Sequence, residues 1–582
     1  MSAEYRKTVH VIFKTHLDLG FTDMAQHVCS AYVDVFIPRA LDLAEATRDR
    51  STERFIWTTG SWLISYYLRV ATPQQVQRME QAIGAGDILW HALPFTTHTE
   101  LMSTELFCHG LSIARDLDRR FGKNTIAGKM TDVPGHTRSM IPHLAAHGIC
   151  YLHIGVNAGS AVVQCPPRFR WRHPAGEEII VTYGSGYDAA AEDIGAEDLL
   201  HFAHTGDNHG PPTVEDVEHE FAAIRQRYPE HTPVASSLDQ YARSLLARRQ
   251  SLPIVTEEFG DTWIHGVGSD PRKVARFRCV DRVLTRSTEP QTATAIDEAR
   301  QHLLLVAEHT WGKDEKSHLK DYANYGWQDF TAARHADLVV NATEDEYGTP
   351  EGGARYTAFE ASWLEQRDAV DHALDALHNT PLHARLLNEL EALKPVRRTL
   401  HGSTPWARGE RVSLAGFDVH FCAQTGALTS CIDHSGQEWA ANGPLAMFLY
   451  QSFDAEDFEL FLQRYNPNLE DTESWARPDF TKPGLQHIEG LTRRHLHPTD
   501  ARFERHGNDV WVEAVMPCPQ ETCYGAPRCV QLHYRFSADH IEIELQWFDK
   551  LPCRLPEASW IGFGLCAESD WLMMKMGSPV SP

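Results

Sequence analysis

The stretch Thr8–Phe21, TVHVIFKTHLDLGF, decides the fold of the N-terminal region. Its apolar run from Val9 to Phe13 is typical of a buried parallel strand, and a Gly-bearing loop follows it. His16 and Asp18 come at the C-terminal end of this strand, and in an extended chain side chains two positions apart point the same way. A neutral imidazole and a carboxylate so placed suit a divalent metal, although a surface His and Asp in a loop is the alternative.

Two later segments offer further ligands of the same kind. After the apolar stretch Thr125–Met130 come Asp132 and a Pro-Gly turn, and the run Met140–His147 is helix-like. His309 follows an apolar helical stretch that begins at Leu303. Taken alone, Asp132 is explained as a helix N-cap, but two His and two Asp from three distant segments would form a zinc site if they converge.

These motifs, in this order, resemble those of glycoside hydrolase family 38, the zinc-dependent retaining α-mannosidases. The segments that carry the resemblance are His16-Leu17-Asp18, the Asp132–His136 motif, the loop GDNHGPPT at Gly206–Thr213 and the late His309. Phe55–Trp57 with Ser61-Trp62 looks like the second-strand segment of that family, and Thr425–Tyr450 looks like the opening of its C-terminal β-domain. The resemblance covers most of the chain.

The neighbours of the motifs depart from the family pattern. Leu19–Phe21 stands where the family has Pro-Gly-Trp, Val133–Thr137 where it has Pro-Phe-Gly-His-Ser, and Glu308–Thr310 where it has His-His-Asp. The residues that match the metal ligands are kept. We therefore expect a divergent, bacterial-type branch in which the identity of the sugar is open.

The resemblance implies roles for individual residues. It makes His16, Asp18, Asp132 and His309 the ligands of one zinc ion, and Asp132 also the nucleophile that forms a glycosyl-enzyme. A retaining hydrolase needs a second carboxyl as general acid/base, and Asp207 in the glycine- and proline-bearing loop is our choice. Asn208 is the alternative alignment at that position, and a solvated turn Asp is the structural alternative.

Five further residues are candidates for substrate contacts. They lie after strands or in aromatic segments that resemble substrate-contacting loops: Trp57, His98, Glu100, Asp261 and Trp311. Each has a purely structural role as its alternative. His143 and His147, four residues apart on a helix, are interpreted as a helix face and not as a second metal pair.

The function expected from these features is a zinc-dependent retaining glycoside hydrolase that acts on an alpha-linked, mannose-like sugar through a carboxylate nucleophile. One alternative is a metal-dependent carbohydrate deacetylase, in which zinc activates water. Another is a catalytically silent sugar-binding protein that keeps the metal as a ligand platform.

The composition of the chain limits the classes of partner and the cellular compartment that we expect. The net charge of −25 argues against nucleic acid and anionic membranes, since both favour a basic surface. No secretory leader is recognisable, and no apolar run approaches the ~20 residues of a membrane span. The 12 cysteines are scattered, and their one cluster, Cys518, Cys523 and Cys529, lacks the spacing of a zinc ribbon. We expect a cytoplasmic protein with a carbohydrate substrate, and homo-oligomer formation is left open.

A chain of 582 residues exceeds what one core supports, and the hydrophobic period changes twice along it. Strands and helices alternate over residues 1–285, which predicts an α/β catalytic barrel with functional loops at the strand C-termini. Residues 286–395 predict a helical bundle, and residues 396–582 an antiparallel β-sandwich-type domain. From Trp571 on no closing strand is obvious, so the β-domain is either compact or truncated.

Overall fold

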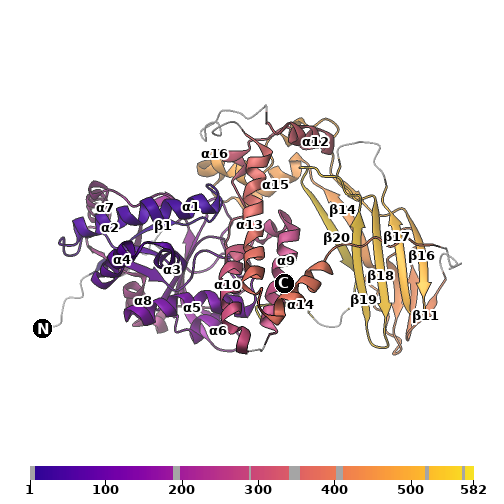
Figure 1. Ribbon diagram of the computed structural model, residues 1–582, viewed down its shortest axis with the longest axis horizontal. Helices are drawn as coiled ribbons and strands as arrows, with labels where there is room; N and C mark the ends of the chain where they lie inside the picture. Colours follow the sequence, from indigo (N-terminus) through magenta and orange to yellow (C-terminus); the bar gives the residue numbers. More distant parts are fainter. Residues whose placement is uncertain are drawn as a thin grey trace.

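The computed structural model describes residues 7–187, 197–287, 290–339, 354–401, 410–517, 524–566 and 570–581. An α/β region, a group of long helices and a region of antiparallel strands follow one another along the chain and across the molecule (Figure 1). This multi-domain arrangement confirms the expected fold class. The boundaries near residues 285 and 395 stay predictions.

The first sheet of the α/β region is built around strand β1 (Thr8–His16). Its order is β3 (Ile88–His91), β2 (Trp57–Gly60), β1 and β8 (Asp198–Asp207), with β9 (Thr232–Ala235) also paired to β1, and all these pairs are parallel. Val9, Val11 and Phe13 face the helices, whereas Ile12 faces the interior. Because side chains alternate along a strand, Lys14 and His16 lie on the interior side with Ile12.

A second sheet closes the other side of the interior. Its order is β10 (Ile254–Val255), β6 (Arg168–Arg172), β7 (Glu178–Ser185), β5 (Tyr151–Val156) and β4 (Ala127–Asp132). Apolar residues from both sheets meet in one cluster: Ile12, Leu200 and Phe202 from the first, and Ala127, Tyr151 and Ile180 from the second. The barrel-like parallel sheet is thus confirmed, with one difference from the expectation. Strand β6 runs antiparallel to β7, because the short turn between them leaves no room for a crossover.

Helices cover the outer face of this barrel-like domain and close its base. They are α1 (Ala25–Ala31), a π-helical turn (Tyr32–Phe36), α2 (Ile37–Thr47), α3 (Ser61–Val70), α4 (Pro73–Ala85), α5 (Thr104–Phe121), α6 (Ile141–Ala146), α7 (Val214–Arg227) and α8 (Leu238–Leu246). Helix α5 shows how the sequence sets their limits. The Ser103 side chain accepts a hydrogen bond from the Leu106 amide at its start, and Gly122, with φ of 62°, ends it in the left-handed conformation.

The central helices share their core with the α/β region. They are α9 (Pro271–Thr285), α10 (Ala293–Ala307), α11 (Glu315–His318), α12 (Trp327–Ala336), α13 (Tyr356–Ala376) and α14 (Pro381–Glu391). Leu303 and Leu304 of α10 belong to the same buried cluster as Val9 and Val11 of β1. This shared core fixes the end of α10, and therefore His309, relative to β1.

The last region consists of two antiparallel sheets around a second core, as expected for a sandwich-type domain. One sheet has the order β11 (Val412–Leu414), β12 (Phe417–Phe421), β13 (Leu428–Ile432), β14 (Leu445–Ser452) and β15 (Arg494–Leu496), with β20 (Glu557–Phe563) beside β14. The other has the order β16 (Asp500–His506), β17 (Asp509–Val515), β18 (Cys529–Phe536) and β19 (Ile541–Phe548). Helices α15 (Ala455–Tyr465) and α16 (Leu469–Phe480) are inserted between strands of this region.

The chain ends in a short hairpin that joins neither sheet of the β-region, so whether that region is compact or truncated stays a prediction. Strands β21 (Met573–Lys575) and β22 (Ser578–Val580) form this hairpin, and Figure 1 marks the C-terminus beside the central helices. The Met576 side chain joins the core of the α/β region, and the Thr104 hydroxyl donates to the Met576 carbonyl. None of the helices in the described ranges has the length and hydropathy needed to cross a membrane.

Candidate metal centre

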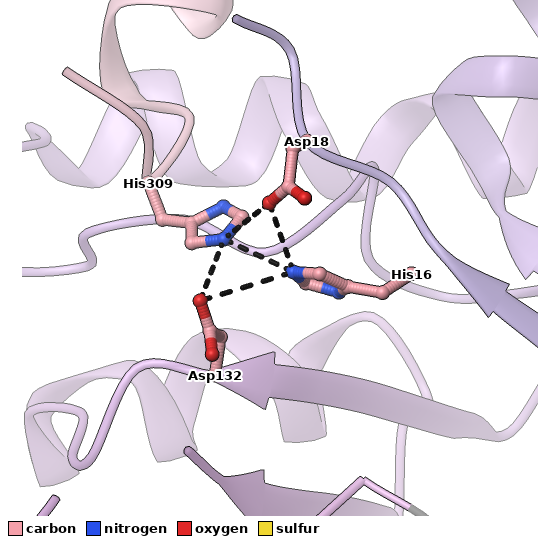
Figure 2. Close-up of side chains that lie close together, drawn as sticks. All are labelled: His16, Asp18, Asp132 and His309. Atoms are coloured by element: carbon pink, nitrogen blue, oxygen red, sulfur yellow. Dashed lines mark hydrogen bonds and ion pairs between the residues drawn. The ribbon is translucent and has the colours of Figure 1, made fainter. Parts of the chain in front are cut away.

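Four side chains converge at the C-terminal end of the central strands. His16 is the last residue of β1 and Asp132 is the last residue of β4, while Asp18 follows β1 by two positions. His309 lies just after the end of α10. All four residues are buried, and Figure 2 shows their side chains pointing toward one point between the two sheets. The sequence prediction that these segments meet is correct.

The ligand atoms lie within 4.8 Å of one another. The His16 and His309 Nε2 atoms are 3.1 Å apart, and Asp18 Oδ1 lies 3.1 and 3.2 Å from them. Asp132 Oδ2 lies 3.2 Å from His309 Nε2 and 3.9 Å from His16 Nε2. Zinc–ligand bonds of about 2.0–2.1 Å in a tetrahedron would place ligand atoms about 3.3 Å apart. The spacing and the donor set therefore fit a zinc ion.

The pKa values in this cluster show how strongly its groups interact. Burial alone would raise the pKa of Asp18, but the two histidine rings outweigh it and hold this pKa below its usual range. Burial alone would lower the pKa of His309, but Glu308, Asp132 and Asp18 hold it well above its usual range. The cluster therefore keeps the Asp18 carboxylate ionised, which is the state that a metal needs.

The Asp132 carboxylate is fixed by its backbone and by two further side chains. Its φ of 85° is rare for a residue with a side chain, and such strain is often found at functional sites. While Oδ2 faces the histidines, Oδ1 accepts hydrogen bonds from Asn157 Nδ2, at 3.0 Å, and from the Tyr187 hydroxyl. Shortly after it, at Gly135, the chain passes so close to another segment that a Cβ atom would lie 1.7 Å from the Phe259 carbonyl oxygen.

The loop that carries His309 is held by its neighbour Glu308. One carboxylate oxygen of Glu308 lies 2.6 Å from His309 Nδ1, and the other accepts hydrogen bonds from the Thr310 amide and hydroxyl. The Thr310 hydroxyl also contacts the Leu19 carbonyl, which joins this loop to the segment after β1. A carboxylate behind a metal-binding histidine orients the ring and raises its basicity.

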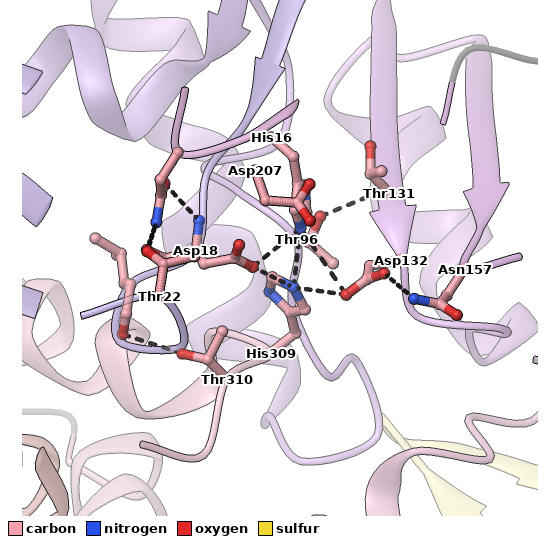
Figure 3. A network of polar contacts seen from close by, with 12 residues as sticks. His16, Asp18, Thr22, Thr96, Thr131, Asp132, Asn157, Asp207, His309 and Thr310 are labelled. Atoms are coloured by element: carbon pink, nitrogen blue, oxygen red, sulfur yellow. Dashed lines mark hydrogen bonds and ion pairs between the residues drawn. The ribbon is translucent and has the colours of Figure 1, made fainter. Parts of the chain in front are cut away.

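Asp207 ends strand β8 directly beside the cluster. It pairs with His16 in the β1–β8 register, and Figure 3 draws it among the side chains around the cluster. Its side chain is 43% exposed, and His204 Nε2 lies 3.7 Å from it. Asn208, the alternative residue, instead binds the backbone of Asp18 through its side-chain amide and has a positive φ of 50°. The structure thus gives Asp207 the open position and Asn208 a supporting one.

Of the five residues predicted to contact substrate, four form one network, in which His98 and Asp261 are buried and Glu100 and Trp311 are half-buried. His98 Nδ1 lies 2.6 Å from Asp261 Oδ2, and its Nε2 accepts a hydrogen bond from Trp311 Nε1. Glu100 accepts a hydrogen bond from the Asp261 amide. The fifth, Trp57, lies in the core between β2 and the helices. Their contact with substrate stays a prediction.

Sequence reasoning missed four polar residues around the cluster. Lys14 precedes His16 by two positions on the same side of β1, and Lys129 lies inside β4. Asn157 and Tyr187 come just after β5 and β7. Two signals could have found them: a lysine inside an otherwise buried strand, and polar residues that follow the ends of parallel strands.

Comparison with known families agrees with this geometry. Residues 6–248 match the sequence model of the glycosyl hydrolases family 38 N-terminal domain, which confirms the resemblance seen in the motifs. Residues 267–544 match a domain of unknown function, DUF5054. Among proteins with curated functions, none matches the chain.

Two solved structures align with the chain. The crystal structure of an alpha-mannosidase from Enterococcus faecalis V583 aligns with a TM-score of 0.52 at 11% identity, over 96% of this chain and 86% of that chain. A protein in the glycosyl hydrolase family 38 from Enterococcus faecalis aligns with a TM-score of 0.47 at 12% identity, over 93% of this chain and 77% of that chain. At 11% identity, the likeness to the alpha-mannosidase structure shows a shared fold alone.

Proposed function

We propose that this chain, whose residues 6–248 match the sequence model of the glycosyl hydrolases family 38 N-terminal domain, is a zinc-dependent retaining glycoside hydrolase for an alpha-linked, mannose-like sugar. The observation that carries the proposal is the convergence of two buried histidines and two buried aspartates within 4.8 Å. Two imidazole nitrogens and two carboxylate oxygens are ligands that zinc takes, and substrate hydroxyls can enlarge its coordination shell. The alpha-mannosidase from Enterococcus faecalis V583, which shares the fold, is in keeping with a mannose-like sugar.

Asp132 is the nucleophile in this proposal. Its Oδ2 atom faces His309 while Asn157 and Tyr187 hold Oδ1, so the carboxylate is fixed before the substrate arrives. A carboxylate oxygen bonds to the anomeric carbon as the glycosidic bond breaks, and the leaving oxygen takes the bonding electrons. When bound, zinc would supply Lewis acidity and hold sugar hydroxyls.

Asp207 supplies and removes the proton. Its carboxylic acid protonates the leaving oxygen in the first step, and in the second its carboxylate takes a proton from the water that releases the sugar from Asp132. A retaining enzyme places its two carboxyl groups about 5–5.5 Å apart. The half-exposed position beside His16 supports this role, because both substrate and water can reach it.

Trapping of the covalent intermediate tests the function. A fluorinated glycosyl fluoride forms the glycosyl-enzyme quickly and releases it slowly, so mass spectrometry of peptides should find one sugar on Asp132. Asp132→Asn should carry no label, whereas Asp116→Asn, the same change at a 61% exposed carboxylate, should be labelled as the wild type is. Release of acetate from acetylated sugars, without labelling, would identify a deacetylase. Sugar binding without turnover or labelling would identify a silent binding protein.

The cytoplasmic location and the oligomeric state stay predictions. Fractionation of cells that express the chain tests the first, and light scattering of the purified protein tests the second.

A further inference from the structure

Helix α16, an insertion of the β-region, packs on the α/β region beside the support of the metal cluster. Asn468, which precedes the helix, donates through its side-chain amide to the Ala158 carbonyl at 3.3 Å. A Cβ atom at Gly159 would lie 2.8 Å from ring atoms of both Trp475 and Phe480, so two rings of α16 pack directly on this backbone. The segment that follows β5 is therefore held by a helix of the β-region.

The same segment holds Asp132. The Asn157 amide donates to the Asp132 carbonyl at 2.9 Å, and Asn157 Nδ2 donates to Asp132 Oδ1 at 3.0 Å. Asn157 Oδ1 accepts a hydrogen bond from the Gly159 amide at 2.9 Å. The backbone on which α16 packs is thus bonded to the residue that fixes the carboxylate of the proposed nucleophile.

The C-terminal end of α16 reaches the segment that follows Asp18. Asp479, the last residue but one of the helix, accepts a hydrogen bond through Oδ1 from the Lys316 ammonium at 2.7 Å. Lys316 lies over the Phe21 ring, 4.8 Å from its centroid, and also donates to Asp314 Oδ2 at 2.8 Å. Phe21 follows Asp18 by three positions. Through these contacts α16 is tied to the chain beside both carboxylates of the metal cluster.

The Asp479 carboxyl adds negative charge to a region that is already acidic. Burial and the Asp314 and Asp132 carboxylates raise the pKa of Asp479 to about 7, although Lys316 acts to lower it. The effect of Asp132 places this carboxyl within electrostatic reach of the proposed nucleophile. Carboxyl groups held at such an electrostatic cost are often found at functional sites.

An ion pair with Lys316 is the purely structural alternative for Asp479. Lys316 and Asp314 are both buried and pair at 2.8 Å, so the lysine has a carboxylate partner without Asp479. The Asp479 side chain is 21% exposed, which leaves it accessible to a ligand. Its position beside Asp132, at the end of the barrel that carries the metal cluster, makes the substrate the natural ligand.

We propose that Asp479 binds a hydroxyl group of the substrate sugar, so that a helix of the β-region forms part of the substrate-binding site. The identity of the ligand rests on the proposed glycosidase function. A carboxylate accepts hydrogen bonds at both of its oxygens, so Lys316 fixes Oδ1 while the sugar hydroxyl donates to Oδ2. Because hydrogen bonds to an ionised acceptor are strong, this contact helps to determine which sugar is bound.

The kinetics of Asp479→Asn test this contact. The variant keeps the shape of the side chain but removes its charge, and kcat/KM for an aryl glycoside should fall about 10–100-fold at unchanged zinc content and melting temperature. Asp471→Asn, the same change at an exposed carboxylate in the first turn of α16, is the matched control and should keep wild-type kinetics. Wild-type kcat/KM in Asp479→Asn would overturn the proposal.

A series of monodeoxy glycosides separates a sugar contact from a structural role. For one member of the series, wild type and Asp479→Asn should have nearly equal kcat/KM, because the hydroxyl that binds Asp479 is already missing. On the other members the variant should keep its full defect. A defect of equal size on every member would make Asp479 a structural residue and would contradict the proposed contact.

A second variant guards against a folding defect in Asp479→Asn. Asp479→Glu keeps a carboxylate beside Lys316 but moves it by one methylene group, which a flexible lysine can follow and a sugar held at the metal cluster cannot. KM should therefore rise several-fold at an unchanged melting temperature. An unchanged KM in a folded Asp479→Glu protein would show that no hydroxyl contact depends on the position of this carboxylate.

Calorimetric titration with methyl α-thiomannoside, a glycoside that resists hydrolysis, tests the contact without turnover. Zinc-loaded wild-type protein should bind it, and Asp479→Asn should bind it about 10–100-fold more weakly. Equal affinity in the two proteins, or no binding by wild type, would overturn the assignment of Asp479. Binding by a wild type that is inactive on every glycoside would instead contradict the glycosidase proposal, and the comparison with Asp479→Asn would still decide the role of Asp479.

Discussion

The Nε2 atoms of His16 and His309 face each other at 3.1 Å, although the two residues are 293 positions apart in the chain. Two neutral rings in this arrangement present lone pairs to each other unless one ring carries a proton or a cation lies between them. The Asp18 carboxylate lies within 3.2 Å of both nitrogens, so negative charge is concentrated at the same point. This relationship is the physical basis of the metal assignment.

Removal of either histidine should abolish zinc binding. His16→Ala and His309→Ala each leave three protein ligands in a buried, acidic pocket, and we expect less than one tenth of the wild-type zinc by elemental analysis. His27→Ala, which removes a 64% exposed ring, should keep the full complement. A full zinc complement in both cluster variants would disprove the ligand set.

The carboxylate of Glu308 should tune the metal site. Glu308→Gln keeps the shape of the side chain but removes the charge beside His309 Nδ1, and loss of such a partner weakens metal binding about 10–100-fold. Competition with a chromogenic chelator measures the change. Glu298→Gln offers the same substitution on α10, away from the cluster, and unchanged zinc affinity is expected for it. Equal zinc affinities in Glu308→Gln and Glu298→Gln would show that Glu308 does not tune the metal site.

Asp207→Ala should separate proton transfer from metal binding. Hydrolysis of unactivated glycosides should fall about 10²–10⁴-fold because the leaving oxygen loses its proton donor. Aryl glycosides with good leaving groups should still form the intermediate, and azide should restore its breakdown by replacing water. Zinc content should not change. Wild-type activity on unactivated glycosides would make Asp207 a turn residue, with Glu100 and Asp261 next to be tested.

Zinc binding should release a proton at neutral pH. The pKa of His309 in the metal-free cluster lies well above its usual range, so the ring is protonated at pH 7 and zinc must displace that proton. A raised folded-state pKa stabilises the metal-free protein at low pH, and this stability is lost as the pH rises through that pKa. Zinc affinity should therefore rise over the same range. Calorimetry in buffers of different ionisation enthalpy counts the protons, and no release at pH 7 would contradict this protonation state.

The part of the site that could be predicted from sequence is the part that lies at strand ends. His16, Asp18 and Asp132 follow apolar runs that predict buried parallel strands, and parallel strands bring their ends to one edge. The residues that hold these side chains in place could not be predicted in this way. Asn157 and Tyr187 reach Asp132 from other strands, and only the packing of the two sheets sets that distance.

The type of each region of the fold could also be predicted from local sequence, but the packing of the regions against one another could not. Hydrophobic period separates parallel, helical and antiparallel regions, but it carries no information on how one region docks on another. The return of the C-terminal hairpin is an example. Lys575 pairs with Glu100 and Glu258, which are 475 and 317 positions away in the chain, and no local pattern around Met573–Lys575 indicates that contact.

The most direct test of the central claim is the anomalous scattering of a crystal of the zinc-loaded protein, measured on both sides of the zinc absorption edge. The account predicts one strong zinc peak per chain, within about 2.0–2.2 Å of His16 Nε2, His309 Nε2 and one carboxylate oxygen each of Asp18 and Asp132. A zinc peak at other residues, or no peak between β1 and β4 in a protein saturated with zinc, would contradict it.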